Sequence, residues 1–153
     1  MRVLGLDPGL ARVGYSVIET DQPLTLLDCG IIRTRPGPSD GERMVEIVGD
    51  LRQLIRLHRP ALAAVEMFFF YRSSKTIAVV QARGAMLMTL ARFGVPVREV
   101  QPMQVKRCLT GNGHADKPEV LDAVMRELQL RDPPRPDDAA DAVAIALTAW
   151  FQR

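Results

Sequence analysis

Apolar residues follow two different patterns along this chain, and each pattern predicts one kind of secondary structure. Short apolar runs bounded by turn residues predict strands, at residues 3–7, 13–18, 24–34, 62–66 and 95–100. Apolar residues that recur at three- and four-residue steps predict amphipathic helices, at 42–58, 73–93, 102–109, 117–128 and 137–151. Pro60 and Gly94 follow the first two helices and are typical helix stops.

The order of the predicted elements indicates an α/β fold. The first three strands follow one another through short connections, which is typical of an antiparallel meander. Each of the other two strands is preceded by a helix, which favours parallel crossover connections. We therefore expect a five-stranded mixed sheet flanked by helices on both faces. The 153 residues contain no linker or repeat, so we expect one domain over residues 1–153.

The composition is that of an ordinary globular protein. Hydrophobic residues make up 47% of the chain and charged residues 25%. No apolar run approaches the roughly 18 residues that span a membrane, and the first residues do not resemble a signal peptide. Cys29 and Cys108 form no metal-type cluster. We expect a cytoplasmic protein with reduced core thiols and no membrane contact.

Four acidic residues stand where functional sites are common, although each also has an ordinary structural explanation. Asp7 and Glu66 end predicted strands, and sites in open mixed sheets tend to lie at the carboxyl ends of strands. Asp138 and Asp141 are three residues apart and therefore share one helix face. Alternatively, Asp7 only opens a turn, Glu66 is a solvated strand end, and acids in a first helical turn favour the helix dipole.

Together, the four acids fit a site for hard divalent cations. Mg²⁺ prefers carboxylate oxygens, and two such ions about 4 Å apart can activate water and stabilise the leaving oxygen in phosphodiester cleavage. The alanines between Asp138 and Asp141 would let their helix pack close to the sheet. Asp137 follows Pro136 and is expected to be the N-cap. The formal charge is +2, and setting four carboxylates aside raises that of the remaining chain to +6, which suits a polyanionic partner.

Six stretches with a specific order and spacing extend over essentially the whole chain. They are LGLDPG (4–9), GYSVI (14–18), VEMFF (65–69), QARG (81–84), QVKRCLTGNGHADK (104–117) and DDAADAVAIA (137–146). This ordered set resembles the bacterial RuvC family of Holliday-junction resolvases, in the ribonuclease H-like superfamily. The resemblance implies a ribonuclease H-like fold and an endonuclease that cuts four-way DNA junctions.

The resemblance also implies a two-metal active site. Asp7 matches the family's first-strand aspartate, which is implied to bridge both cations, and Glu66 matches its strand-end glutamate. Asp138 and Asp141 match the paired acids of the last helix. The implied cofactors are two Mg²⁺ ions per active site, with Mn²⁺ as a substitute. Hydrolysis would leave 5′-phosphate and 3′-hydroxyl ends.

Five further residues are candidate DNA contacts. Lys106 and Lys117 match basic residues that the resemblance implies to contact phosphates, and Phe69 matches an aromatic implied to stack on a base at the opened crossover. Arg72 and Lys75 follow this aromatic segment and would lie beside the DNA backbone, unless they only form a solvated helix start.

The resemblance implies partners as well as a substrate. A homodimer would match the two-fold symmetry of a junction and make paired, symmetric nicks in strands of like polarity. Besides four-way junction DNA, the implied partner is the RuvA–RuvB branch-migration complex, in homologous recombination and DNA repair.

Three other functions stay open at this point: a nuclease for RNA or RNA–DNA hybrids, a phosphate-binding ATPase or sugar-kinase relative, and a junction-binding protein without catalysis. Two residues also keep alternative roles. Arg83 is either structural or DNA-facing, and His114 is either a solvated loop residue or a phosphate contact.

Overall fold

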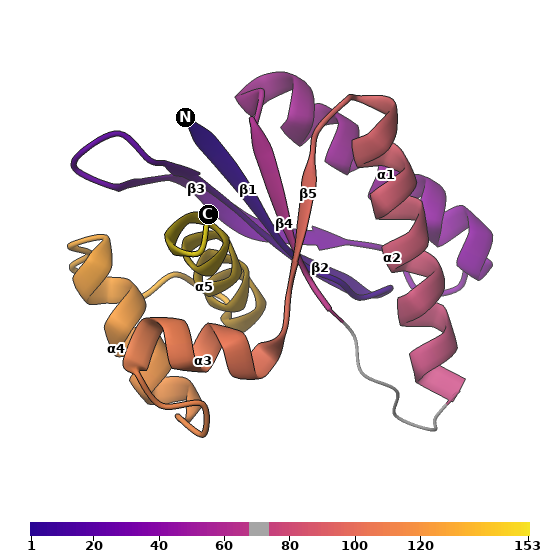
Figure 1. Ribbon diagram of the computed structural model, residues 1–153. Coiled ribbons are helices and arrows are strands. Elements are labelled where there is room, and N and C mark those ends of the chain that lie inside the picture. Colours follow the sequence, from indigo (N-terminus) through magenta and orange to yellow (C-terminus); the bar gives the residue numbers. More distant parts are fainter. Residues whose placement is uncertain (68–73) are drawn as a thin grey trace.

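The computed structural model describes residues 1–67 and 74–153, without the side chains of Ser74 and Lys75. These residues form five strands and five helices (Figure 1). The strands are β1 (Arg2–Asp7), β2 (Arg12–Glu19), β3 (Thr25–Arg33), β4 (Leu62–Glu66) and β5 (Val97–Val100). The helices are α1 (Asp40–His58), α2 (Ser74–Arg92), α3 (Pro102–Thr110), α4 (Lys117–Glu127) and α5 (Asp137–Phe151). Each described boundary lies within two residues of the predicted one.

The strands form one mixed sheet in the order β3-β2-β1-β4-β5. β1, β2 and β3 make the predicted antiparallel meander, whereas β4 pairs in parallel with both β1 and β5. Leu6 of β1 lies opposite Val65 of β4. Asp7 and Glu66 directly follow these two paired residues. They therefore lie side by side at the carboxyl ends of β1 and β4.

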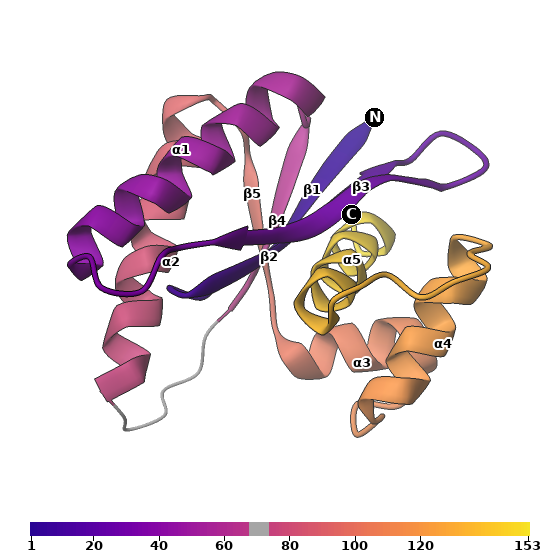
Figure 2. The same cartoon turned by 180° about the vertical axis from the view of Figure 1, so that it is seen from behind.

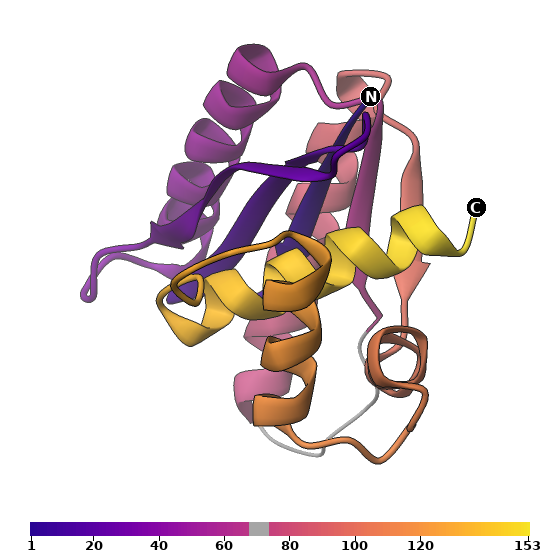
Figure 3. The same cartoon turned by 90° about the vertical axis from the view of Figure 1, so that its left-hand side faces the viewer.

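Helices cover both faces of the sheet, as predicted (Figures 1 and 2). On one face, Leu6 of β1 shares a buried cluster with Leu51 of α1 and Met86 of α2. On the other face, Val3 of β1 shares a buried cluster with Ile145 of α5, and residues of α3 and α4 complete it. Figure 3 shows α5 running across the strands rather than along them. The first turn of α5 thereby reaches the carboxyl end of β1.

Two local details differ from the sequence-based expectation. β5 begins at Val97 rather than Val95, because the Val95 amide donates to the Leu90 carbonyl at 3.0 Å and Pro96 has no amide hydrogen. Cys29 and Cys108 are free thiols, but both are only partly buried. None of the helices in the described residues is long and apolar enough to cross a membrane.

Candidate active site

Small residues of the sheet allow α5 to approach β1 and β2 closely. A Cβ atom at Gly14 would overlap the backbone carbonyl of Asp138, and a Cβ atom at Gly5 would overlap that of Ala142. The Ser16 hydroxyl donates a hydrogen bond to the Ala142 carbonyl at 2.8 Å, which holds α5 at this short distance from the sheet. Backbone-to-backbone packing of this kind brings the acids of the first turns of α5 to the carboxyl end of β1.

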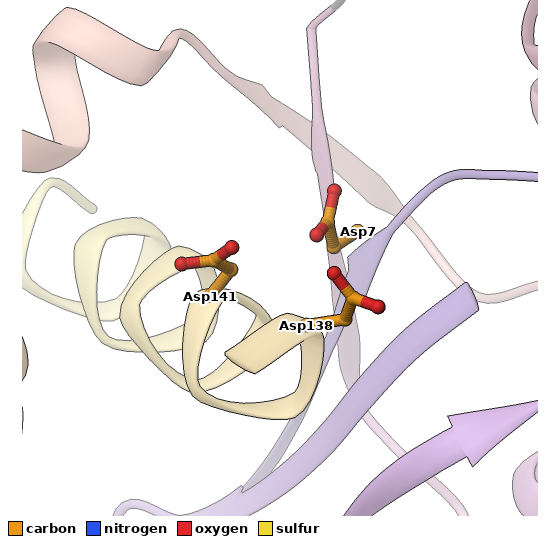
Figure 4. Close-up of side chains that lie close together, drawn as sticks. All are labelled: Asp7, Asp138 and Asp141. Carbon is orange, nitrogen blue, oxygen red and sulfur yellow. The ribbon is translucent and has the colours of Figure 1, made fainter. Parts of the chain in front are cut away.

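Three of the four predicted acids form a tight group at this point, and Glu66 lies beside it. One carboxylate oxygen from each of Asp7, Asp138 and Asp141 lies within 4.8 Å of the other two (Figure 4). Glu66 is not part of this mutual 4.8 Å group, but its charge raises the pKa of Asp7 and, together with Asp141, it lines a pocket of about 180 Å³. All four side chains are partly buried. A set of carboxylate oxygens is the donor type preferred by Mg²⁺ and Mn²⁺.

Burial and mutual repulsion oppose ionisation of this cluster. Burial, followed by the charges of the other three acids, raises the pKa of Asp7 to about 8, although Lys117 acts in the opposite direction. Burial and the charge of Asp141 also raise the pKa of Glu66. Carboxylates that repel one another at neutral pH are stabilised by a cation between them. The cluster therefore fits a divalent cation site on electrostatic grounds as well as on its donor atoms.

Both predicted lysines lie beside the acids. Lys117 is the first residue of α4, where the side chain of Asp116 caps the helix. Its Nζ atom lies 3.2 Å from Oδ2 of Asp141, and this hydrogen bond raises the pKa of the lysine. Lys106 of α3 lines the same pocket as Glu66 and Lys117. The two lysines thus border the α3–α4 side of the acid cluster.

Arg12 is a third basic neighbour, which the sequence-based interpretation missed. Its Nε atom lies 3.0 Å from Oδ2 of Asp138. The sequence signal that could have identified Arg12 is the alternation of side chains between the two faces along β2. Arg12, Gly14 and Ser16 alternate with apolar residues that pack on the opposite face, so all three face α5.

Comparisons with known proteins agree with this geometry. A family model described as "Crossover junction endodeoxyribonuclease RuvC" matches residues 3–149. The chain belongs to the RuvC family. Among RuvC proteins, it is 72% identical to that of Synechococcus sp. (strain WH7803) and 73% identical to that of Parasynechococcus marenigrum (strain WH8102), in each case over 100% of both chains.

Solved RuvC structures share the fold. The structure of T. thermophilus RuvC in complex with a Holliday junction substrate superimposes with a TM-score of 0.93 at 39% identity. The match covers 100% of this chain and 95% of that one. The predicted ribonuclease H-like fold and the resemblance to RuvC are therefore confirmed.

One predicted role in this RuvC-family site is wrong: Asp137 is not the N-cap of α5. The N-cap is Pro136, whose backbone is extended (φ −72°, ψ −173°) and which makes no side-chain capping bond. The chain therefore enters the helix at Asp137, as its first helical residue. Asp137 is exposed and lies outside the acid cluster, where its charge can still favour the helix N-terminus.

The remaining candidates divide into described and undescribed residues. Phe69 and Arg72 lie outside the described residues, as does the side chain of Lys75. Arg83 has a structural role: its Nε atom donates to the Glu66 carbonyl at 3.1 Å and its Nη2 atom pairs with Glu99 at 2.7 Å. His114 is exposed in its loop.

Without divalent cations, the stability of the protein is expected to fall as pH rises. The pKa of Asp7 is about 8 in the folded protein against an ordinary value of 3.8, so the folded state keeps a proton that the unfolded chain has lost. The free energy of unfolding should therefore decrease between about pH 4 and about pH 8, and Glu66 acts in the same direction.

Urea denaturation in EDTA across this pH range measures the effect. Asp7→Asn should flatten much of the decline, because the amide has no proton to lose. Asp137→Asn, which removes an exposed acid outside the cluster, should leave the decline intact. A slope that is unchanged in Asp7→Asn would contradict the raised pKa.

Proposed function

We propose that this protein is a structure-specific DNA endonuclease that resolves four-way junctions in homologous recombination and DNA repair. The observation that carries the proposal is that Asp7, Glu66, Asp138 and Asp141 lie together at the carboxyl ends of β1 and β4, in a chain of the RuvC family. The structural match to T. thermophilus RuvC with a Holliday junction substrate supports four-way junction DNA as the substrate. The whole chain would act as one nuclease domain in the cytoplasm.

The four acids would hold two Mg²⁺ ions, or Mn²⁺ in their place. When bound, these cations supply the charge that activates water and stabilises the departing 3′ oxygen. The close packing of α5 against β1 and β2 would keep the spacing of these carboxylates fixed. In-line attack would leave a 5′-phosphate and a 3′-hydroxyl, which a ligase can rejoin.

The basic and aromatic residues would bind the DNA. Lys117, already held at 3.2 Å from Asp141, would contact a phosphate next to the cleaved bond, and Lys106 another across the shared pocket. Phe69 lies close in sequence to Glu66 and would stack on a base exposed at the crossover. Arg72 and Lys75 would follow the backbone beyond it.

We also propose a homodimer, supported by an exposed and almost uncharged face of α2. Ile77, Val80 and Met88 are 64%, 45% and 54% exposed, and they recur at helical spacing on one side of the helix. Such a face is costly in water unless a partner covers it. Two-fold symmetry would direct one active site to each of two strands of like polarity. The RuvA–RuvB complex would be the branch-migration partner.

One experiment tests the proposed function directly. The protein is incubated with Mg²⁺ or Mn²⁺ and a synthetic four-way junction, linear duplex, single strand or RNA–DNA hybrid, and the products are mapped on a denaturing gel. We expect two symmetric nicks confined to the junction. Cleavage confined to the hybrid would replace the proposal with a hybrid nuclease, and binding to the junction without cleavage would leave only a binding protein.

Phe69→Ala is expected to lower the rate of junction cleavage more than junction affinity. Stacking on one base contributes about 1–3 kcal/mol, and it is needed only once the crossover opens. The rate should therefore fall at least about fivefold, with a change in affinity smaller than that. Single-turnover cleavage and fluorescence anisotropy measure the two quantities. Phe151→Ala, at the exposed end of α5, is the control. Equal losses of rate and affinity would argue against a role in opening the crossover.

A further inference from the structure

The acid cluster has basic residues on two sides, and the proposed function uses only one of them. Lys117 and Lys106 border it on the α3–α4 side. On the other side, Arg12 of β2 lies directly opposite Arg33 of β3 in the antiparallel register. This arginine pair lies near one edge of the sheet, since β3 is the outermost strand.

Both arginines face α5. Along β2, Gly14 and Ser16 lie against Asp138 and Ala142, and Arg12 has the same parity. Residues directly opposite each other in an antiparallel pair project to the same face of the sheet, so Arg33 shares this direction. The pair therefore lies on the face that carries the first turn of α5 and beside its acids.

This pair carries more positive charge than its described neighbours compensate. Arg12 pairs with Asp138 and keeps 45% of its side chain exposed. In the described part of the chain, Arg12 forms an ion pair with Asp138 alone, and the exposed Arg33 side chain forms no hydrogen bond or ion pair. Like charges directly opposite each other in a sheet destabilise it, and an anion bound between them would relieve the repulsion.

The order of charges across this edge of the sheet suits one DNA strand. Arg33 and Arg12 are followed by the acids, and the acids by Lys117 on α4. A strand whose scissile phosphate lies over the acids would have its neighbouring phosphates over the two basic groups. We propose that Arg12 and Arg33 bind a backbone phosphate of the cleaved strand, on the side of the scissile bond opposite Lys117. This rests on the proposed endonuclease function.

The salt dependence of junction binding tests the proposal. All variants carry Asp7→Asn, so that the junction stays uncut, and binding is measured by anisotropy over a range of salt concentrations. In a plot of log affinity against log salt concentration the slope is negative, and the loss of one phosphate contact makes it less steep by about 0.9. We expect this decrease for Arg33→Gln and not for Arg126→Gln, a control at the far end of α4. An unchanged slope in Arg33→Gln would overturn the proposal. A thermal midpoint at or above that of the parent shows that the variant folds.

A chemical probe then tests the position of the phosphate. Junctions carry a single neutral methylphosphonate at successive positions on either side of the cleavage site. At one position, on one side of the cleavage site only, the methylphosphonate should weaken junction binding by the parent protein. At that same position it should not weaken junction binding by Arg33→Gln. If the loss of affinity from Arg33→Gln and the loss from the methylphosphonate were additive at every position, the assignment would be overturned. If the otherwise unchanged protein cuts no junction at all, the proposed function fails; if it cuts and Arg33→Gln behaves as the parent, only this inference fails.

Discussion

Replacement of Asp7 by asparagine is expected to reduce junction cleavage at least about 10³-fold, which corresponds to about 4 kcal/mol of transition-state stabilisation. Asp7 is the acid on which the others converge: it lies within 4.8 Å of Asp138 and Asp141, and the charge of Glu66 raises its pKa. An amide is neutral, so it cannot supply the negative charge with which Asp7 would help to hold the cations. Junction affinity should change little, because basic residues bind the phosphates.

Single-turnover cleavage at saturating Mg²⁺ and junction binding in EDTA separate the two effects. Asp137→Asn is the matched control, because it removes the same charge one residue from Asp138 but outside the cluster. It should cleave within about threefold of the unchanged protein, because the charge of Asp137 is exposed to solvent and screened and is not one of those that would hold the cations. Asp7→Asn that still cleaves at a normal rate would rule out the four-acid metal site.

The elements around this site could be predicted from the sequence, because each carries a local signal. The apolar runs of β1 and β4 both stop at an acid, and α5 begins where proline gives way to alanine-rich sequence. The convergence of the acids could not be predicted in this way. It depends on β4 pairing in parallel with β1, and on Gly5 and Gly14 lying under α5, contacts between residues far apart in the chain.

The errors have physical causes of the same kind. Asp137 has the side chain of a good N-cap, but the backbone at Pro136 takes that position and leaves the aspartate one residue inside the helix. Arg12 has no motif of its own and gains its place only because β2 runs antiparallel to β1, so that its start lies beside the end of the first strand. Side-chain type is a local property, whereas the partner of a side chain is set by topology.

Replacement of Gly14 by alanine is expected to lower both stability and cleavage, because the added methyl group has no space. It would overlap the backbone carbonyl of Asp138, which cannot rotate away as a side chain could. Overpacking of a core typically costs about 1–3 kcal/mol in the free energy of unfolding. Relief of the overlap must move the first turn of α5 away from β1, and a displacement of about 1 Å at a reacting centre can cost about 10²-fold in rate.

Urea denaturation and cleavage at saturating Mg²⁺, both at a temperature where the variant is folded, measure the two losses. Gly49→Ala is the control for a change from glycine to alanine. Its site in α1 has open space for a Cβ atom, so it should stabilise the helix by about 0.5–1 kcal/mol and leave cleavage unchanged. If Gly14→Ala lost stability but cleaved normally, the acids would not depend on the height of α5 above the sheet. If it lost cleavage well beyond its loss of stability, the glycine contact would be what sets the spacing between Asp7 and the acids of α5.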